Sequence, residues 1–322
     1  MIVGCIDPFD PKILEMIRGH LPDSWKLIHA LGESKSEKIA ALSEADVCFL
    51  MAAPLTEELM RAAPKLSFIQ KLGAGLDRID LDYCRERRIR VAKLFAGNSV
   101  PVAEHTLMLM LAATRRLVWL DQATRAGKWN KEAVRASNQH LCGKTVGIIG
   151  FGAIGRQVSR LLSGFGVRQL YFDPIRADKE MEQDFQVSYL PLDELLSCSD
   201  IITLHLPLLE STRLLIDSKK LGLMKSTSVV INCARGGLID EQALFEALET
   251  RRIFGAGIDA FSQEPPLDSP LIESRYVTVT PHCAGATIDN FNSVVRRAVE
   301  NTQIVLEGGS LPVGDEEVLW PK

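Results

Sequence analysis

The stretch Gly150-Phe151-Gly152-Ala153-Ile154-Gly155 decides the fold of this chain of 322 residues. An apolar run typical of a β-strand, residues 145–149, precedes it, and residues 156–162, whose apolar side chains have helical spacing, follow it. The three glycines therefore lie at a turn from a strand to a helix. The first would allow the tight turn, the second would let the backbone approach a pyrophosphate, and the third would let the helix pack closely on the strand. The N–H groups at the start of that helix favour phosphate, so the pattern predicts a dinucleotide-binding unit.

An acidic residue at the expected distance strengthens this interpretation. The next β-type run, residues 168–172, ends at Asp173. That position lies roughly 20 residues beyond the turn, where a carboxylate accepts hydrogen bonds from the adenosine ribose. Its charge would repel a 2′-phosphate, so we expect NAD (NADH), and Arg176 close by leaves NADP as the less favoured alternative.

Composition sets the class of protein. With 46% hydrophobic and 24% charged residues the chain is an ordinary globular protein, long enough that two domains are expected. A net charge of −4 gives no basic face for nucleic acid. The longest apolar run, 107–113, is too short to cross a membrane, and the first residues lack the basic region of a signal peptide. The seven cysteines are scattered without metal-ligand spacing, so we expect no metal, reduced thiols and a cytoplasmic location.

Two series of alternating strands and helices indicate an α/β fold with two doubly wound parallel sheets. In the first series the expected strands are 2–6, 26–30, 47–51, 67–72 and 90–94, and the expected helices are 11–18, 36–45, 56–63 and 82–87. In the second, the strands are 145–149, 168–172, 187–190, 201–206, 228–233, 255–259 and 277–280, and the helices are 193–197, 218–223, 240–253 and 288–306. We expect the last helix and the tail to fold back onto the first domain.

The two series are joined by a segment without helix breakers. Pro101 suits a first helical turn, and nothing from there to about Gly127 would end a helix. We therefore predict one long helix of roughly 40 Å. Its apolar residues 102–113, with Leu117, Trp119 and Leu120, need burial, which favours a homodimer joined through the nucleotide domains.

Three polar residues follow strand ends in the second series, at the edge where parallel sheets bind ligands. Arg235 could hold a carboxylate with its planar fork, although a lone surface arginine usually has a structural ion pair. Glu264 alone would be an ordinary loop acid, and His282 alone would more often be structural. Together they form a unit in which His282 exchanges a proton with a carbonyl or hydroxyl group, Glu264 favours its protonated form, and Arg235 polarises the carbonyl.

These motifs, in this order, resemble the D-isomer-specific 2-hydroxyacid dehydrogenase family over essentially the whole chain. The resemblance rests on the glycine turn with Asp173, on His205-Leu206-Pro207, on residues 232–237, on 257–261 with Glu264-Pro265, and on Thr280-Pro281-His282. It implies two Rossmann/flavodoxin-like domains with the active site in the cleft between them. The substrate-binding domain would comprise 1–98 plus 289–322, and the NAD-binding domain would comprise 99–288.

The resemblance also implies roles for single residues. Arg235, Glu264 and His282 would be catalytic, and Asp259 would hold the nicotinamide carboxamide. The cofactor-binding set would be Gly150, Gly152, Ala153, Ile154, Gly155, Asp173, His205, Pro207, Thr212, Cys233, Ala234, Asp259 and His282. The substrate-binding set would be Ala52, Leu72, Gly73, Ala74, Gly75 and Arg235.

Two loops of the first series bear on the substrate. The glycines of residues 71–77 could form a nest of N–H groups for a carboxylate, or a plain turn. The apolar loop 51–54 lacks the arginine typical of phosphoglycerate dehydrogenases and favours a small or apolar 2-keto acid. We expect an NAD-dependent enzyme that interconverts a 2-keto acid and a D-2-hydroxy acid. The alternative is a dinucleotide-sensing binding protein of the co-repressor type on the same fold.

Overall fold

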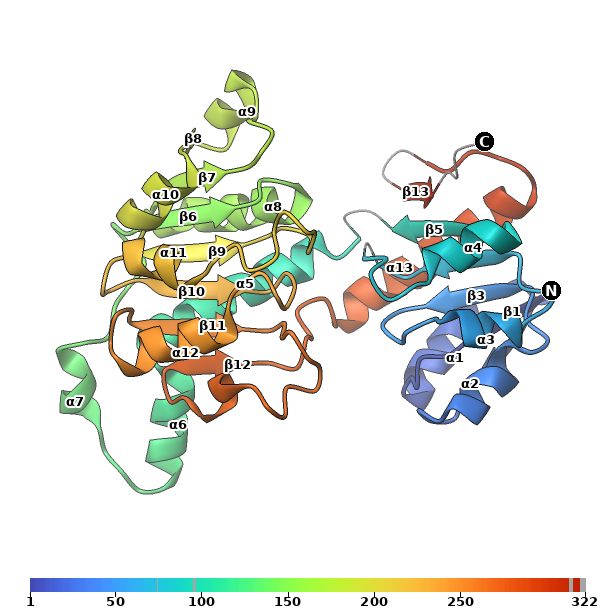
Figure 1. Ribbon diagram of the computed structural model, residues 1–322, viewed down its shortest axis with the longest axis horizontal. Helices are drawn as coiled ribbons and strands as arrows, with labels where there is room; N and C mark the ends of the chain where they lie inside the picture. Colours follow the sequence, from blue (N-terminus) through green and yellow to red (C-terminus); the bar gives the residue numbers. More distant parts are fainter. Residues whose placement is uncertain (74, 95–96, 313–314, 319–322) are drawn as a thin grey trace. The chain divides into compact units, whose positions relative to one another are not determined.

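The computed structural model describes residues 1–73, 75–94, 97–312 and 315–318. The chain divides into two compact units, and each is described by itself (Figure 1). Unit 1 comprises Met1–Asn98 with Thr287–Lys322, and unit 2 comprises Ser99–Ala286. None of the helices in the described ranges combines the length and the apolar character that crossing a membrane requires.

Unit 1 is built on a sheet of order β13-β5-β4-β3-β1-β2, in which β13 alone runs antiparallel to its neighbour. Its strands are β1 (Ile2–Cys5), β2 (Lys26–His29), β3 (Val47–Leu50), β4 (Phe68–Lys71), β5 (Arg90–Leu94) and β13 (Asp315–Val318). Its helices are α1 (Pro11–His20), α2 (Lys35–Leu42), α3 (Glu57–Arg61), α4 (Leu81–Arg87) and α13 (Ile288–Leu306). The parallel part has the flavodoxin-like order, with the switch between β1 and β3.

Unit 2 is built on a seven-stranded parallel sheet of order β12-β11-β10-β9-β6-β7-β8. Its strands are β6 (Thr145–Ile149), β7 (Arg168–Phe172), β8 (Val187–Tyr189), β9 (Ile201–Leu204), β10 (Val229–Asn232), β11 (Gly255–Ile258) and β12 (Val277–Val279). Its α-helices are α5 (Ser99–Arg115), α6 (Leu117–Arg125), α7 (Lys131–Arg135), α8 (Ala153–Leu162), α9 (Lys179–Asp184), α10 (Leu192–Cys198), α11 (Ser218–Leu223) and α12 (Glu241–Glu249), and its 3₁₀ turns are η1 (Ser163–Phe165) and η2 (Pro270–Glu273). This is the Rossmann order, with the switch between β6 and β9.

Both sheets are apolar on both faces, because parallel strands are covered by helices on each side. Along β3, Val47 and Phe49 belong to one buried cluster, and Cys48 and Leu50 belong to the other. The strands of unit 2 alternate between two clusters in the same way. Two parallel-sheet α/β units confirm the predicted fold class.

The prediction of one continuous helix from Pro101 to about Gly127 is wrong. Helix α5 ends at Arg115, Arg116 has a positive φ of 50°, and α6 begins at Leu117. No glycine or proline marks the break, so it has no local signal in the sequence. A second correction concerns α12, which ends at Glu249, four residues before the predicted end, and is followed by Arg251 at φ 60°.

Candidate active site

The glycine turn between β6 and α8 leaves no room for side chains at two of its three glycines. Gly150 has φ 95°, and a Cβ there would lie 2.4 Å from the carbonyl oxygen of His205. A Cβ on Gly155 would lie 2.1 Å from the carbonyl oxygen of Gly150. A Cβ on Gly152, in contrast, would have nothing within 4 Å, and no side chain caps α8 at this residue. Open space beside the N–H groups of Ala153 and Ile154 at an uncapped helix start fits a bound pyrophosphate.

Asp173 lies beside this turn, at the carboxyl end of β7. Its Oδ2 accepts a hydrogen bond from the N–H of Phe151 at 2.8 Å, and its Oδ1 accepts one from the N–H of Ile175 at 3.0 Å. The carboxylate therefore fixes the conformation of the glycine turn and is itself held in place. Lone pairs remain on both oxygens for a further donor such as a ribose hydroxyl.

His205 follows β9 and cannot supply a proton near neutral pH. His205 as a residue is partly exposed, but its ring Nδ1 is buried and has no hydrogen-bond partner among the described residues. Its Nε2 lies 3.0 Å from Thr203 Oγ1. Burial lowers the pKa of His205 to about 3, so the ring is neutral. Beyond it, Thr212 Oγ1 donates to the carbonyl oxygen of Pro207 at 2.7 Å and holds the 207–212 loop together.

The loop after β10 presents Arg235 from a braced backbone. Asn232 Nδ2 donates to the carbonyl oxygen of Arg235 at 2.8 Å, and its Oδ1 accepts from the N–H of Ala234 at 3.0 Å. Arg235 Nη1 donates to the carbonyl oxygen of Ala234 at 2.8 Å. A Cβ on Gly236 would lie 1.9 Å from the backbone of Phe261, so only glycine lets this loop contact the loop that carries Glu264.

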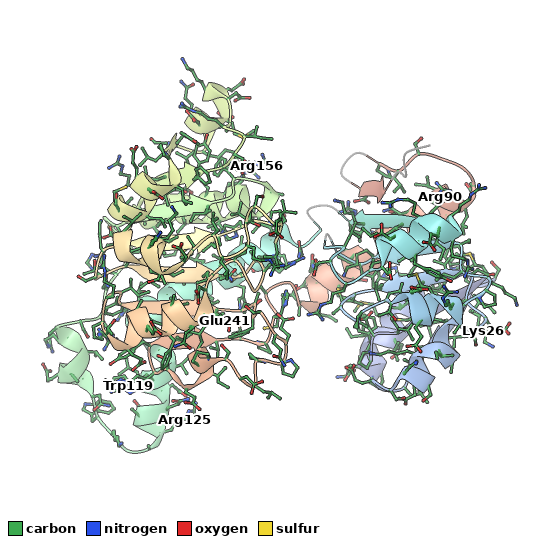
Figure 2. The ribbon with its side chains drawn as sticks, viewed as in Figure 1. Lys26, Arg90, Trp119, Arg125, Arg156 and Glu241 are labelled. Atoms are coloured by element: carbon green, nitrogen blue, oxygen red, sulfur yellow. The ribbon has the colours of Figure 1, made fainter. Side chains whose placement is uncertain are left out.

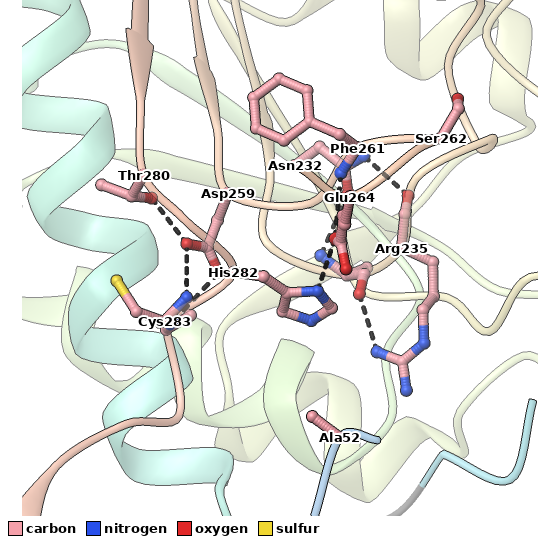
Figure 3. Close-up of polar contacts among 12 residues, drawn as sticks. Ala52, Asn232, Arg235, Asp259, Phe261, Ser262, Glu264, Thr280, His282 and Cys283 are labelled. Atoms are coloured by element: carbon pink, nitrogen blue, oxygen red, sulfur yellow. Dashed lines mark hydrogen bonds and ion pairs between the residues drawn. The ribbon is translucent and has the colours of Figure 1, made fainter. Parts of the chain in front are cut away.

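His282 and Glu264 form a direct pair (Figure 3). His282 Nδ1 lies 2.6 Å from Glu264 Oε1, which also accepts from the N–H of Phe261 at 3.3 Å. Because a carboxylate accepts only, Nδ1 donates to it, and Nε2 is the ring atom left to exchange a proton. The His282 side chain is 39% exposed and that of Glu264 is 19% exposed, so a ligand can reach the imidazole. His282 has φ 51°, a strained conformation for a side chain with a Cβ and one that is common at functional sites.

Asp259 anchors the loop that carries His282. The carboxylate is fully buried and accepts from the N–H groups of Cys283 at 2.9 Å and Ala284 at 3.0 Å. Thr280 Oγ1 donates to its Oδ1 at 2.6 Å, and His105 Nε2 lies 3.0 Å from the same Thr280 oxygen (Figure 3 shows the Thr280 contact). The resemblance implies that Asp259 holds the nicotinamide carboxamide. In the structure its carboxylate accepts from three donors in the loop after β12, which carries His282. His105 on α5 was missed, because its partners lie more than 150 residues away along the chain.

The thiols near this loop are neutral. Burial raises the pKa of Cys233 to about 12, and burial, followed by the nearby Asp259 charge, also raises the pKa of Cys283.

Ligand atoms of His105, Asp259 and Cys283 lie within 4.8 Å of one another, a spacing that could hold a metal ion. Asp259 and His105 already have the hydrogen-bond partners described above, so we assign this cluster to holding the loop. Cys233 and Ala234 are almost completely buried, and only their backbones are suited to ligand contact.

In unit 1 the predicted substrate residues follow β3 and β4, which are neighbours in the sheet. The backbone at Ala52 is held by Asp7, a buried residue that sequence reasoning missed. Asp7 Oδ2 accepts from the N–H of Met51 at 2.7 Å, and its Oδ1 accepts from those of Ala52 and Ala53 at 2.6 and 2.7 Å. The N–H group of Ala52 is therefore committed to Asp7.

The second predicted substrate loop follows β4. Leu72 is buried, and its N–H donates to the carbonyl oxygen of Leu50 at 2.8 Å. A Cβ on Gly73 would meet nothing within 4 Å, so its backbone faces open space. Gly75 lies in the same loop, and Ala74 lies outside the described residues.

Within each unit the parallel strands bring the predicted residues to one edge of the sheet. In unit 2 that edge carries the glycine turn, Asp173, His205, Arg235 and the His282–Glu264 pair (Figure 3 shows Arg235 and the pair). The fold and this edge define a dinucleotide-binding α/β protein with an accessible histidine–carboxylate pair and a nearby arginine.

Comparisons with known proteins identify the family. Residues 107–284 match the model of the NAD-binding domain of the D-isomer specific 2-hydroxyacid dehydrogenases. A glyoxylate reductase of Korarchaeum cryptofilum is 35% identical over 294 residues, which cover 90% of this chain and 87% of that protein. The chain therefore belongs to the D-isomer specific 2-hydroxyacid dehydrogenase family, a family of NAD-dependent oxidoreductases. The predicted resemblance is confirmed.

Two further relatives show the range of the family. A D-3-phosphoglycerate dehydrogenase of Mycobacterium leprae is 35% identical over 94% of this chain, but the chain spans only 57% of that longer protein. The structure of NAD-dependent formate dehydrogenase from Staphylococcus aureus in complex with NAD covers the whole chain, with 27% identity and a TM-score of 0.86.

Proposed function

We propose that this protein reduces a small 2-keto acid to a D-2-hydroxy acid with NADH, and catalyses the reverse reaction. The observation that carries the proposal is the His282–Glu264 pair, 2.6 Å apart, at the sheet edge that also presents Arg235 and the glycine turn. Unit 1 would bind the substrate carboxylate and unit 2 the cofactor. The names of the relatives, which include a glyoxylate reductase, support a keto acid as the substrate class.

In the proposed mechanism His282 is the general acid in the reduction. Glu264 holds Nδ1 and stabilises the positive ring, so that Nε2 can donate its proton to the carbonyl oxygen. Arg235 polarises that carbonyl and binds the substrate carboxylate through its guanidinium group. The bound nicotinamide supplies the hydride. In the oxidation His282 Nε2 accepts the hydroxyl proton.

Residues of unit 2 would hold the cofactor through backbone and carboxylate groups. The N–H groups of Ala153 and Ile154 would bind the pyrophosphate, and Asp173 would accept from the adenosine ribose. We propose NAD(H) in preference to NADP(H), because Asp173 places a negative charge where NADP carries its 2′-phosphate. His205, Pro207, Thr212, Cys233 and Ala234 complete the proposed cofactor-binding set.

The proposed substrate is small or apolar on the side opposite its carboxylate. The loop at residues 51–54 is apolar, and Asp7 uses the N–H groups of residues 51–53, so this loop offers no donors to a phosphate. The backbone at Leu72, Gly73, Ala74 and Gly75 would bind the carboxylate.

We also propose a homodimer joined through unit 2. The outer faces of α5 and α6 expose the large apolar residues Met108, Leu111, Leu117 and Val118, and Figure 2 shows Trp119 projecting from α6. Such a patch on a globular protein usually marks an interface. A monomer mass by light scattering at micromolar concentration would contradict this assembly.

We also propose a cytoplasmic location. The seven cysteines are all free thiols, which supports this proposal, and cell fractionation can test it.

The decisive test is a turnover assay with NADH and a panel of glyoxylate, hydroxypyruvate, pyruvate and larger apolar 2-keto acids. We expect oxidation of NADH with at least one small acid, formation of the D-hydroxy acid by chiral chromatography, and lower kcat/KM with a phosphorylated keto acid. Tight NADH binding by calorimetry without turnover of any acid would instead favour a dinucleotide-sensing protein.

A further inference from the structure

Three arginines meet at the edge of unit 2 opposite the proposed active site. Arg116 lies between α5 and α6, Arg251 follows α12, and Arg275 immediately precedes the tyrosine that leads into β12. Phe254 and Tyr276, the aromatic residues between them, directly precede β11 and β12, whereas Asp259 and Thr280 follow the same two strands. The cluster is therefore at the amino ends of these strands, and the proposed catalytic residues are at their carboxyl ends.

The guanidinium groups surround the two aromatic rings. Arg116 Cζ lies 4.6 Å from the centroid of the Phe254 ring and 5.8 Å from that of Tyr276. Arg251 Cζ lies 4.3 Å from the Tyr276 centroid, and Arg275 Cζ lies 4.8 Å from it. Arg275 Nη2 also donates to the Tyr276 hydroxyl at 2.5 Å. Contact with a ring uses the face of a guanidinium group and leaves the remaining N–H donors in its plane for other partners.

The three guanidinium groups have no carboxylate partner in the part of the chain that the structure describes. Within the described ranges, no carboxylate oxygen lies within 4.0 Å of any of the three guanidinium groups. Arg116 Nε is buried and has no hydrogen-bond partner there. Burial, together with the nearby charges of Arg251 and Arg275, lowers the pKa of Arg116. A buried donor without an acceptor and three adjacent cations both raise the free energy of the empty cluster, and an anion would lower it.

The backbone at two of these positions is strained. Arg116 has φ 50° and Arg251 has φ 60°, conformations that glycine adopts without strain. Arg251 follows the C-cap of α12, where glycine is the usual residue. The chain therefore carries long cationic side chains at positions where glycine would be unstrained, a feature that clusters at functional sites.

We propose that Arg116, Arg251 and Arg275 form a binding site for a multiply charged phosphate anion, separate from the nucleotide site. The ligand class is a pyrophosphate or polyphosphate group, because three guanidinium forks supply more charge than one carboxylate neutralises. This inference does not depend on the proposed catalytic activity.

The test is isothermal titration of the whole chain with inorganic pyrophosphate. Because the glycine turn could also bind this anion, titrations are made with saturating NADH and, separately, on Gly152→Asp, whose carboxylate occupies open space and repels phosphate at the turn. In both cases we expect one bound pyrophosphate per chain, with affinity that falls as salt is raised. Absence of binding in both would overturn the proposal.

Variants identify the residues involved. Arg251→Gly relieves the strained φ and should fold at least as well as the native chain, and Arg275→Gln removes an exposed charge. Each should weaken pyrophosphate binding about tenfold or more, the equivalent of one charge-assisted hydrogen bond. Arg168→Gln, which removes an exposed arginine elsewhere in unit 2, is the matched control and should bind normally.

Two results would refute the assignment. Equal binding in all variants would mean that the arginines only stack on the rings. Variants that shift the monomer–dimer equilibrium in sedimentation, while pyrophosphate binding is absent, would mean that a second copy of the chain supplies the missing negative charge.

Discussion

The two α/β units use the same topological position in opposite ways. In unit 1 the switch between β1 and β3 holds a carboxylate, Asp7, which accepts three backbone N–H groups of the next loop. In unit 2 the switch between β6 and β9 is lined by glycines, and the N–H groups at the start of α8 have no side-chain cap. A carboxylate at the switch uses the donors that an anion would need, whereas glycines leave them accessible. The difference explains why unit 2 is suited to a pyrophosphate at its switch and why the proposed carboxylate site of unit 1 falls on the neighbouring loop.

The largest effect should come from the side chains that unit 2 carries at the carboxyl ends of its strands. His282→Ala removes the proposed general acid, so we expect kcat to fall by about 10²–10⁴ while NADH binding changes little. Steady-state kinetics and fluorescence titration of NADH measure the two quantities. Glu264→Gln keeps an acceptor for His282 Nδ1 and should lower kcat less. If His282→Ala kept native kcat, the proton would come from another group.

The carboxylate of unit 1 should matter mainly for stability. Asp7→Asn replaces one acceptor oxygen of a buried carboxylate, which accepts from three N–H groups, by a donor, so we expect the free energy of unfolding to fall by about 3 kcal/mol or more. Urea denaturation measures it. Asp10→Asn is the control, because Asp10 accepts one N–H at an exposed helix start and its loss should cost about 1 kcal/mol or less. Equal effects of the two changes would mean that Asp7 does not organise the switch.

His205, at the switch of unit 2, should make stability depend on acid pH. Its pKa is about 3 in the folded chain and about 6.5 unfolded, so below pH 6.5 the unfolded state binds the additional proton. The free energy of unfolding should therefore fall as the pH drops from about 6.5 toward 3, by about 2 kcal/mol at pH 5. Urea denaturation at pH 7 and pH 5 should show a smaller fall in His205→Gln than in the native chain. Identical falls would mean that other groups account for the dependence.

The smallest effect concerns the choice of cofactor. Asp173→Asn keeps one of the two acceptor oxygens but removes the charge, so kcat/KM for NADPH relative to NADH should rise by roughly tenfold, or ~1.4 kcal/mol. Asp173→Ala removes both acceptors, for the N–H groups of Phe151 and Ile175, and should lower affinity for both cofactors. A native preference for NADPH would refute the role proposed for Asp173.

The sequence predicted the elements whose signals are local. Alternating apolar runs located the parallel strands of both units, and the glycine turn with Asp173 located the switch of unit 2. Residues whose partners are distant could not be found in this way. Asp7 is one of 41 acidic residues and its partners lie 44 to 46 positions away, and His105 lies within an apolar helix. The break at Arg116 was missed because a left-handed arginine has no sequence signature.

The return of the chain to unit 1 has a consequence for its synthesis. Unit 2 is continuous, whereas unit 1 also needs α13 and β13, which pairs antiparallel with β5. Asp315, in β13, accepts hydrogen bonds from Arg297 and Asn301 of α13. A ribosome therefore delivers every residue of unit 2 while unit 1 still lacks a helix and an edge strand. Unit 1 is begun first and completed last, and the open edge of β5 is available to other chains until residues 315–318 have emerged.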